Sequence, residues 1–430
     1  MVNVAKVFST LGNPNSLIPL AIKDTASTAG MTAGSYITGK EEGHDRFIDE
    51  VGTEVIWLGG IPFFKWLYDK TVFNAMGLDS KFDARNLKDK DVLAKIKEYA
   101  PTDKIKKDIE KIAKKEKTFK NVASGKFFIS TALTIASYIG LTKFKQKYTD
   151  KKIRENLIKE YQESQATKAK DEKAKEVNSS TNPSFKGLGS AIESLAFSPV
   201  KNMWVLDGAI TAERLKDSRS KQEFIGYAIK EASILFFMYY AGGKIQEMLE
   251  NYAESKHKMS IGLDARVIED GYLKKAFEDG SIVKSLEEFK SANTSSANLY
   301  EFLHKNPDNL VVKTAELSDL ISKHKETGKI DTRKYIDLKD IEGTKNKIEK
   351  LYNQYKEAIS SGKTSEEFFS KVKKLKRNSI ITGIGSCMFA LGVLTPAVML
   401  LNRMASEDNQ EFETKKRIRE QLIKEGVIAW

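Results

Sequence analysis

The sequence predicts an all-α, duplicated helical membrane protein. We expect two parallel repeats with about two hydrophobic helices each, and an extramembrane helical insertion in the second repeat. Three observations support this class. Lys, Glu, Ala, Leu and Ile dominate between the apolar runs, and strand-like alternation is scarce, which favours helices. Some apolar segments are long enough to cross a bilayer. The order of apolar and charged segments also occurs twice.

The duplication is clearest in a ten-residue charged stretch. KKIRENLIKE at 151–160 returns as KRIREQLIKE at 416–425, and eight of the ten positions are identical. A hydrophobic segment precedes each copy, at 127–142 in the first case and at 379–401 in the second. Each segment is approached through a stretch rich in lysine.

A second pair of hydrophobic segments lies further upstream. These segments are 51–68 and 228–245, and a Gly-Leu-Asp sequence follows each of them. Four matches in the same order indicate an internal duplication. The predicted organisation is a first repeat at 1–161, a flexible polar linker at 162–186, and a second repeat at 187–430 with a helical insertion at 267–370.

The four hydrophobic segments differ in how strongly they predict a crossing. Residues 378–402 carry no charge, and as a helix they reach roughly 37 Å, enough for a hydrocarbon core of about 30 Å. Segment 127–142 reaches about 24 Å, and lysines at its ends can extend it by snorkelling. Segments 51–68 and 228–245 have shorter uncharged runs, for which buried or re-entrant helices are the alternative.

The repeated charged helix favours four crossings. If all four segments cross, both copies emerge on the same side of the membrane, as expected for a duplicated surface helix. If only the second and fourth segments cross, the copies lie on opposite sides. We therefore expect an inner (plasma) membrane protein with both termini in the cytoplasm.

Two carboxylates occupy equivalent positions in the repeats. Glu54 and Glu231 each stand at the start of an apolar run. A carboxylate inside a membrane bundle is costly and by default marks an ion path or a proton relay. The alternative is that both lie at the headgroup interface near helix N-termini, where acidic side chains are favoured.

The repeated helix carries a narrow apolar stripe and many cations. The stripe consists of Ile153, Leu157 and Ile158, and it returns in the second copy. We expect the stripe to rest on the bundle or on the bilayer interface while the cations face acidic headgroups. The alternative is a solvated helix that only stabilises itself. The candidate lipid-facing cations are Lys151, Lys152, Arg154, Lys159, Lys416, Arg417, Arg419 and Lys424.

Composition limits the chemistry and the partners. The formal net charge of +12 favours anionic partners, and one cysteine with four scattered histidines offers no metal or nucleophile pattern. No nucleotide-binding or hydrolase motif is present, so we predict no cofactor, no metal site and no enzyme.

The predicted role is structural: scaffolding or partner binding at a membrane through basic amphipathic helices. One alternative is a small transporter or channel that uses the paired carboxylates at the repeat interface. Another is a peripheral basic protein that binds acidic lipid or nucleic acid. The expected partners are the bilayer, its anionic headgroups, and a protein bound through 267–370; nucleic acid is disfavoured because no dense Arg/aromatic patch occurs.

Overall fold

The computed structural model describes residues 4–13, 16–165, 199–218, 221–292, 295–404 and 413–429. Over these ranges the chain is all-helical and forms no strand, only one isolated antiparallel bridge between Lys323 and Ile330. The predicted all-α class is therefore confirmed. Most of the predicted linker at 162–186 lies outside the described residues.

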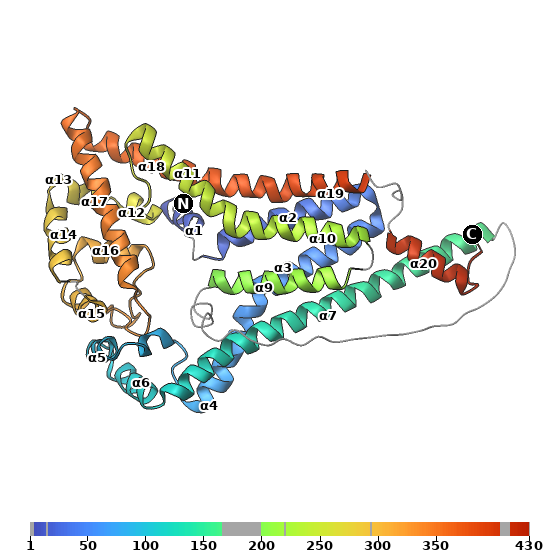
Figure 1. Ribbon diagram of the computed structural model, residues 1–430, viewed down its shortest axis with the longest axis horizontal. Coiled ribbons are helices and arrows are strands. Elements are labelled where there is room, and N and C mark those ends of the chain that lie inside the picture. Colours follow the sequence, from blue (N-terminus) through green and yellow to red (C-terminus); the bar gives the residue numbers. More distant parts are fainter. Residues whose placement is uncertain are drawn as a thin grey trace.

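Six long elements of the described chain run side by side as an elongated bundle (Figure 1). They alternate in direction wherever short connections join them, as in antiparallel helical bundles. The elements are α2 (Ile18–Thr38), α3 (Lys40–Tyr68), α7 (Glu116–Gln165), α9 (Pro199–Lys216), α10 (Lys221–Ile234) continuing through η3 (Leu235–Ala241) into α11 (Gly242–His257), and α18 (Ser365–Phe389) continuing through η4 (Ala390–Leu394) into α19 (Thr395–Met404).

Shorter helices gather at one end of the bundle, in what we call the helical cap (residues 74–119 and 259–372; Figure 1). The predicted insertion forms much of the cap, and it shares one apolar core with residues of the first repeat such as Phe82, Ile96 and Phe119. Helix α1 (Val4–Gly12) packs against α12 at this end. The short elements are η1 (Asp69–Phe73), α4 (Asn74–Met76), η2 (Ala84–Leu87), α5 (Lys90–Glu98), α6 (Asp103–Lys114), α12 (Ala265–Asp270), α13 (Tyr272–Glu278), α14 (Ser281–Ala292), α15 (Ser296–Lys305), α16 (Leu310–Leu317) and α17 (Leu338–Ser360).

The two copies of the repeated helix pack against each other at the opposite end, which we call the far end. Helix α20 (Glu413–Lys424) crosses the last turns of α7 (Figure 1). Ile153 and Leu157 from one copy and Ile418 and Leu422 from the other form a small buried cluster. The stripe predicted to rest on the bundle or the bilayer is therefore covered by the second copy of the same sequence.

Glycines allow two elements to approach closely inside the bundle. A Cβ placed on Gly30 of α2 would lie 2.0 Å from the carbonyl oxygen of Gly392 in η4, and a Cβ on Gly392 would lie 2.8 Å from the carbonyl oxygen of Ala26. Such contact between backbones is typical of helices that associate in membranes. Gly392 of η4 thus packs directly against α2.

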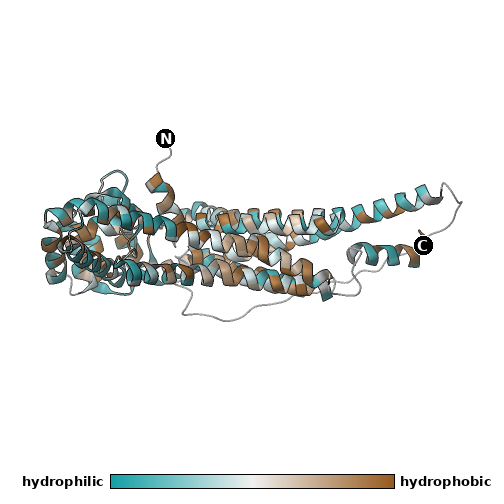
Figure 2. Cartoon of the chain, turned by 90° about the horizontal axis from the view of Figure 1, so that it is seen from above, coloured by the Kyte–Doolittle hydropathy of each residue, from teal (hydrophilic) through white to brown (hydrophobic). Residues whose placement is uncertain are grey.

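The bundle exposes apolar side chains along its length. Large apolar side chains on its outer surface include Ile381 at 57% and Leu401 at 64% exposed, and brown residues run along the long helices in Figure 2. Among the described residues, two helical stretches are long and apolar enough to cross a membrane, Glu116–Glu163 and Ser365–Asn402, and only 33% and 22% of their most apolar windows are buried. They contain segments 127–142 and 379–401. Segments 51–68 and 228–245 lie in α3 and in α10–η3–α11.

Candidate functional site

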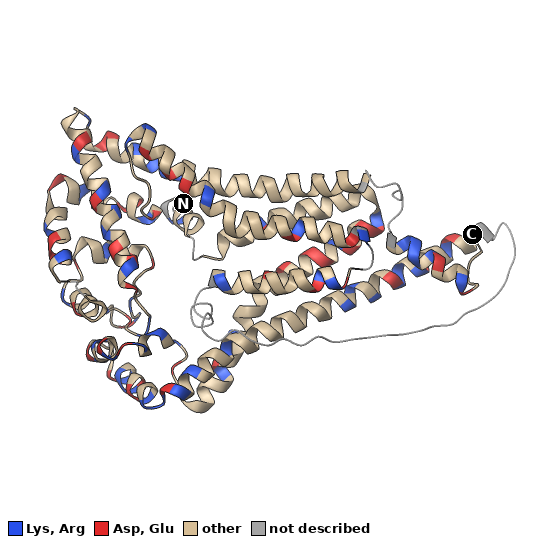
Figure 3. Ribbon diagram, in the orientation of Figure 1, with Lys and Arg blue, Asp and Glu red and all other residues tan. Residues whose placement is uncertain are grey.

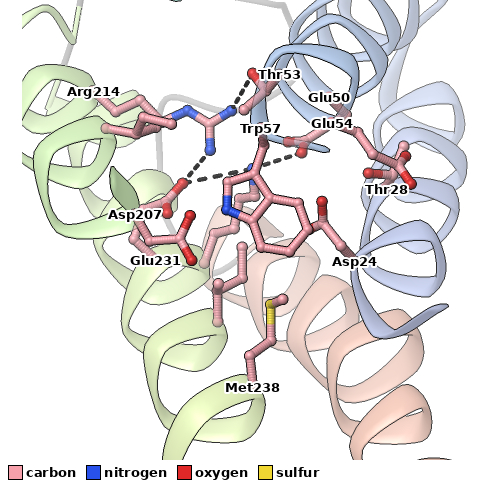
Figure 4. A pocket seen from close by; sticks show the side chains of 13 residues that line it. Asp24, Thr28, Glu50, Thr53, Glu54, Trp57, Asp207, Arg214, Glu231 and Met238 are labelled. Carbon is pink, nitrogen blue, oxygen red and sulfur yellow. Dashed lines mark hydrogen bonds and ion pairs between the residues drawn. The ribbon is translucent and has the colours of Figure 1, made fainter. Parts of the chain in front are cut away.

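A small polar cavity, which we call the carboxylate cavity, lies inside the bundle between elements of the two predicted repeats (Figure 4). Helices α2 and α3 contribute one wall, and α9, α10 and η3 contribute the other. Both sequence-predicted carboxylates, Glu54 and Glu231, line it. The complete lining is Asp24, Thr28, Glu50, Thr53, Glu54, Trp57, Asp207, Ile210, Arg214, Lys230, Glu231, Ile234 and Met238.

The two predicted carboxylates have different surroundings. Glu231 accepts a hydrogen bond from the Arg214 guanidinium and another from the Thr211 hydroxyl at 3.3 Å, and the Lys230 ammonium lies 3.6 Å from it. Glu54 accepts a hydrogen bond from the Thr25 hydroxyl. The structure brings the pair to one cavity but compensates the charge of Glu231 alone with adjacent cations.

Buried ion pairs extend from this cavity and join the repeats. Arg214 of the second repeat donates to Asp49 at 3.3 Å and to the Tyr138 hydroxyl at 2.9 Å, both in the first repeat. Lys230 of the second repeat donates to Glu50 of the first at 2.6 Å. The connections therefore cross the repeat interface in both α9 and α10.

Lys145 of α7 extends this network toward the far end. Its ammonium lies 3.5 Å from Asp49 and 3.7 Å from Asp45, and it donates to the Tyr227 hydroxyl at 3.3 Å. The side chains of Lys145, Arg214 and Lys230 are only 2–3% exposed. Charges removed from water this completely are stable only when they are paired and hydrogen-bonded, and each of these cations meets that condition.

A second pair of equivalent carboxylates faces the same cavity. Asp24 begins the sequence D-x-A-x-T-A in α2, and Asp207 begins the same pattern in α9. Sequence reasoning missed these two residues, although the repeated six-residue pattern was available as a signal. One aspartate and one glutamate from each predicted repeat therefore line the cavity.

The symmetry fails at the cations. Arg214 stands seven positions after Asp207, and Met31 stands seven positions after Asp24. Lys230 directly precedes Glu231, whereas Thr53 directly precedes Glu54. The second repeat therefore supplies both cations that line the cavity, and the equivalent positions in the first repeat are neutral.

Trp57 places an indole N–H donor at this cavity (Figure 4). The side chain is almost completely buried, and its Nε1 atom makes no well-aligned hydrogen bond among the described residues, although Asp207 and Tyr239 lie beside it. Indole nitrogen can only donate, and a buried donor without an acceptor costs about 1–3 kcal/mol. The site therefore offers a donor to any small polar molecule that enters.

The candidate lipid-facing cations of the repeated helices lie around the α7–α20 pair. Lys151, Lys152, Lys159, Lys416, Arg417 and Lys424 are exposed, and Arg154 and Arg419 are half-buried. Two of the arginines bridge the copies, since Arg154 pairs with Glu425 and Arg417 donates to Asp150 at 2.9 Å. At least these two arginines therefore hold one copy against the other.

Other chemistry finds no support among the residues that the structure describes. They contain no group of three or more His, Cys, Asp or Glu side chains arranged to hold a metal ion. The single cysteine, Cys387, is buried in α18. Comparisons with protein-family models, curated proteins and solved structures found no match. Support for a function therefore comes from the bundle and its buried polar residues.

Proposed function

We propose that this chain is an integral membrane protein of the inner (plasma) membrane whose bundle holds the helical cap and the α7–α20 pair on opposite faces of the bilayer. One observation supports the membrane placement above all others. The bundle has apolar side chains outside and ion pairs inside, which is the reverse of the usual distribution in a water-soluble protein. Hydrocarbon around the bundle accounts for both features.

Charged residues mark where the bilayer would begin and end. Figure 3 shows α18–η4–α19 without charge over most of its length, whereas α7, α9 and α10 carry charged residues within the bundle, several of them in its buried network. On α18–η4–α19 the uncharged run 378–402 is long enough for the hydrocarbon core. Cations near the cap end include Lys65, Lys126, Lys244 and Arg377, and those near the far end include Lys40, Lys143, Lys216 and Lys221.

The course of the chain limits the number of crossings. Helix α1 lies at the cap and α20 at the far end, so α2 must cross together with α3, α7, α10–η3–α11 and α18–η4–α19. Helix α7 ends at the far end, whereas α9 begins at the cap end. We propose five complete crossings, with α9 enclosed in the bundle, in place of the four crossings and the two cytoplasmic termini that the sequence alone favours.

The buried network favours a scaffold over a moving carrier. Asp49–Arg214 and Glu50–Lys230 join the repeats through paired and hydrogen-bonded charges. In an apolar environment such pairs resist separation, because each broken pair leaves an uncompensated charge. A rigid bundle of this kind would hold the cap at the membrane surface, where the cap, including the insertion at 267–370, would bind a partner protein.

A second candidate function is translocation of a proton or a monovalent cation. The observation that favours it is the cavity itself, which places Glu54 and Glu231 together at the interface of two repeats. Transporters built from repeats bind their substrates at such interfaces. Neither cation that lines the cavity pairs with Glu54. We therefore expect the transported proton or cation to bind on the Glu54 side of the cavity.

Two experiments test these proposals. Membranes washed with alkaline carbonate should retain the chain, and its release into the wash would contradict integral placement. In cells or proteoliposomes, Glu54→Gln and Glu231→Gln should abolish function in a transporter, whereas a scaffold should keep partner binding in the Glu54→Gln variant. Exposed Glu247, which pairs with Lys244 at 2.7 Å, provides the matched control Glu247→Gln.

A further inference from the structure

The carboxylate cavity carries more negative charge than its own cations compensate. Five carboxylates line it, whereas Arg214 and Lys230 are its only two lining cations. Glu50 and Glu231 take these two cations as partners. Uncompensated charges in a membrane interior are costly, so the remaining carboxylates require another source of positive charge.

Asp24 is the carboxylate with the least support from its neighbours. Glu54 accepts from Thr25, and Asp207 accepts from Tyr239. No hydrogen bond or ion pair holds the carboxylate of Asp24 among the described residues, although it faces the cavity (Figure 4). Its equivalent, Asp207, belongs to the predicted repeat that supplies both cations. Asp24 belongs to the other predicted repeat, in which Met31 and Thr53 occupy the positions of the two cations.

The indole of Trp57 gives independent support for a small polar occupant. Its N–H, which lacks a well-aligned acceptor among the described residues, lies in the same lining as Asp24, Glu54 and Asp207. A water molecule could accept from the indole and donate to a carboxylate, because water does both. Such a water would connect the carboxylates and carry a proton between them.

We propose that Asp24 is a proton-binding residue, and that Glu54 and Asp207 relay the proton to it through the carboxylate cavity. In the step, a protonated Glu54 or Asp207 gives its proton, directly or through a water in the cavity, to the Asp24 carboxylate, so Asp24 becomes a neutral carboxylic acid and the donor returns to its carboxylate; the relay is protonated again from the aqueous side. The inference rests on the membrane placement proposed above, and it supplies the site that the second candidate function requires. A metal ion fits less well, since the described residues offer no group of ligands for one.

The groups that face Asp24 come from every wall of the cavity. Helix α3 contributes Glu50 and Glu54, α9 contributes Asp207 and Arg214, α10 contributes Lys230 and Glu231, and η3 contributes Tyr239. On the side of α18, Cys387 lies near Lys23 of α2. The acids outnumber the cations around Asp24, so the surroundings favour its neutral form.

Infrared difference spectroscopy on the full chain in lipid nanodiscs tests the proposal. At neutral pH the wild type should show the carbonyl stretch of protonated carboxylic acid, and Asp24→Asn should remove the component that Asp24 contributes. Glu54→Gln and Asp207→Asn identify any component from the other two carboxylates that lack a cation. Glu247→Gln changes an exposed carboxylate and should leave the band intact. Adding sodium ions should not change it. A band that Asp24→Asn leaves unchanged, or one that sodium abolishes, would overturn the assignment.

Thermal unfolding provides a second reading that does not depend on the band. Asn resembles a neutral aspartic acid, so Asp24→Asn should keep the stability of the wild type at neutral pH. A large loss of stability, or failure to fold, would show that Asp24 is ionised and paired, which contradicts the proposal. Retention on carbonate-washed membranes tests the membrane placement separately, so the two ideas can fail independently.

Discussion

Arg214→Met tests the buried network most sharply, because it gives the second repeat the residue that the first repeat has at Met31. The Arg214 side chain is 3% exposed, and it contacts Glu231 directly and Asp49 at 3.3 Å. Removing one partner of a buried pair costs about 3–5 kcal/mol. Since Glu231 keeps Lys230 at 3.6 Å, we expect a loss near the lower end, about 3 kcal/mol.

The measurement is the free energy of unfolding in detergent micelles, from denaturant titration of wild type, Arg214→Met, Glu231→Gln and the double variant. Because the two groups interact directly, we expect a coupling energy of about 1–3 kcal/mol. Arg266→Met removes an exposed pair with Asp319 and should cost less than about 1 kcal/mol. If Arg214→Met stayed within about 0.5 kcal/mol of wild type, the network would not be buried and paired as described.

Three further predictions concern the α7–α20 pair and the packing of α2. Leu157→Ala and Leu422→Ala each empty the same buried cluster, so each should cost about 2–5 kcal/mol of local stability and expose α20 to hydrogen exchange to a similar degree. The hydrogen bond from Arg154 lowers the pKa of the Glu425 carboxyl. The ion pair therefore stabilises α20 fully at pH values above the ordinary pKa of a glutamate. This stabilisation is lost as the pH falls through the lowered pKa of Glu425, so the sensitivity of α20 to protease should rise there. Gly30→Ala forces a Cβ to within 2.0 Å of a backbone oxygen in η4, and it should lower the unfolding free energy by about 1–3 kcal/mol.

Much of the local structure could be predicted from the sequence. The all-α class follows from composition and apolar periodicity, and the Thr364–Glu367 capping box at the start of α18 has a pattern that can be read directly from the sequence. The apolar face of α17, including Ile341, Ile348 and Leu351, is buried in the cap. These features depend on residues that are close in the sequence, where spacing alone determines the geometry.

The parts that the sequence did not reveal depend on distant partners. The apolar stripe at Ile153 was visible, but its covering by Ile418 requires two helices far apart in the chain to meet. The carboxylates Glu54 and Glu231 were found through their equivalent positions, whereas Asp24 and Asp207 were missed although each begins the same six-residue pattern. Charge compensation by Arg214 joins residues 165 positions apart, and no local pattern reports such a contact.

The membrane placement can be tested most directly by cysteine accessibility in intact cells and inverted vesicles. Cys387 is buried and gives little background, so single cysteines can replace Lys106 in the cap and Lys159 and Lys416 near the far end. We predict that Lys106→Cys reacts from one side of the membrane, and that Lys159→Cys and Lys416→Cys both react from the other. Labelling of all three positions from the same side would contradict this prediction.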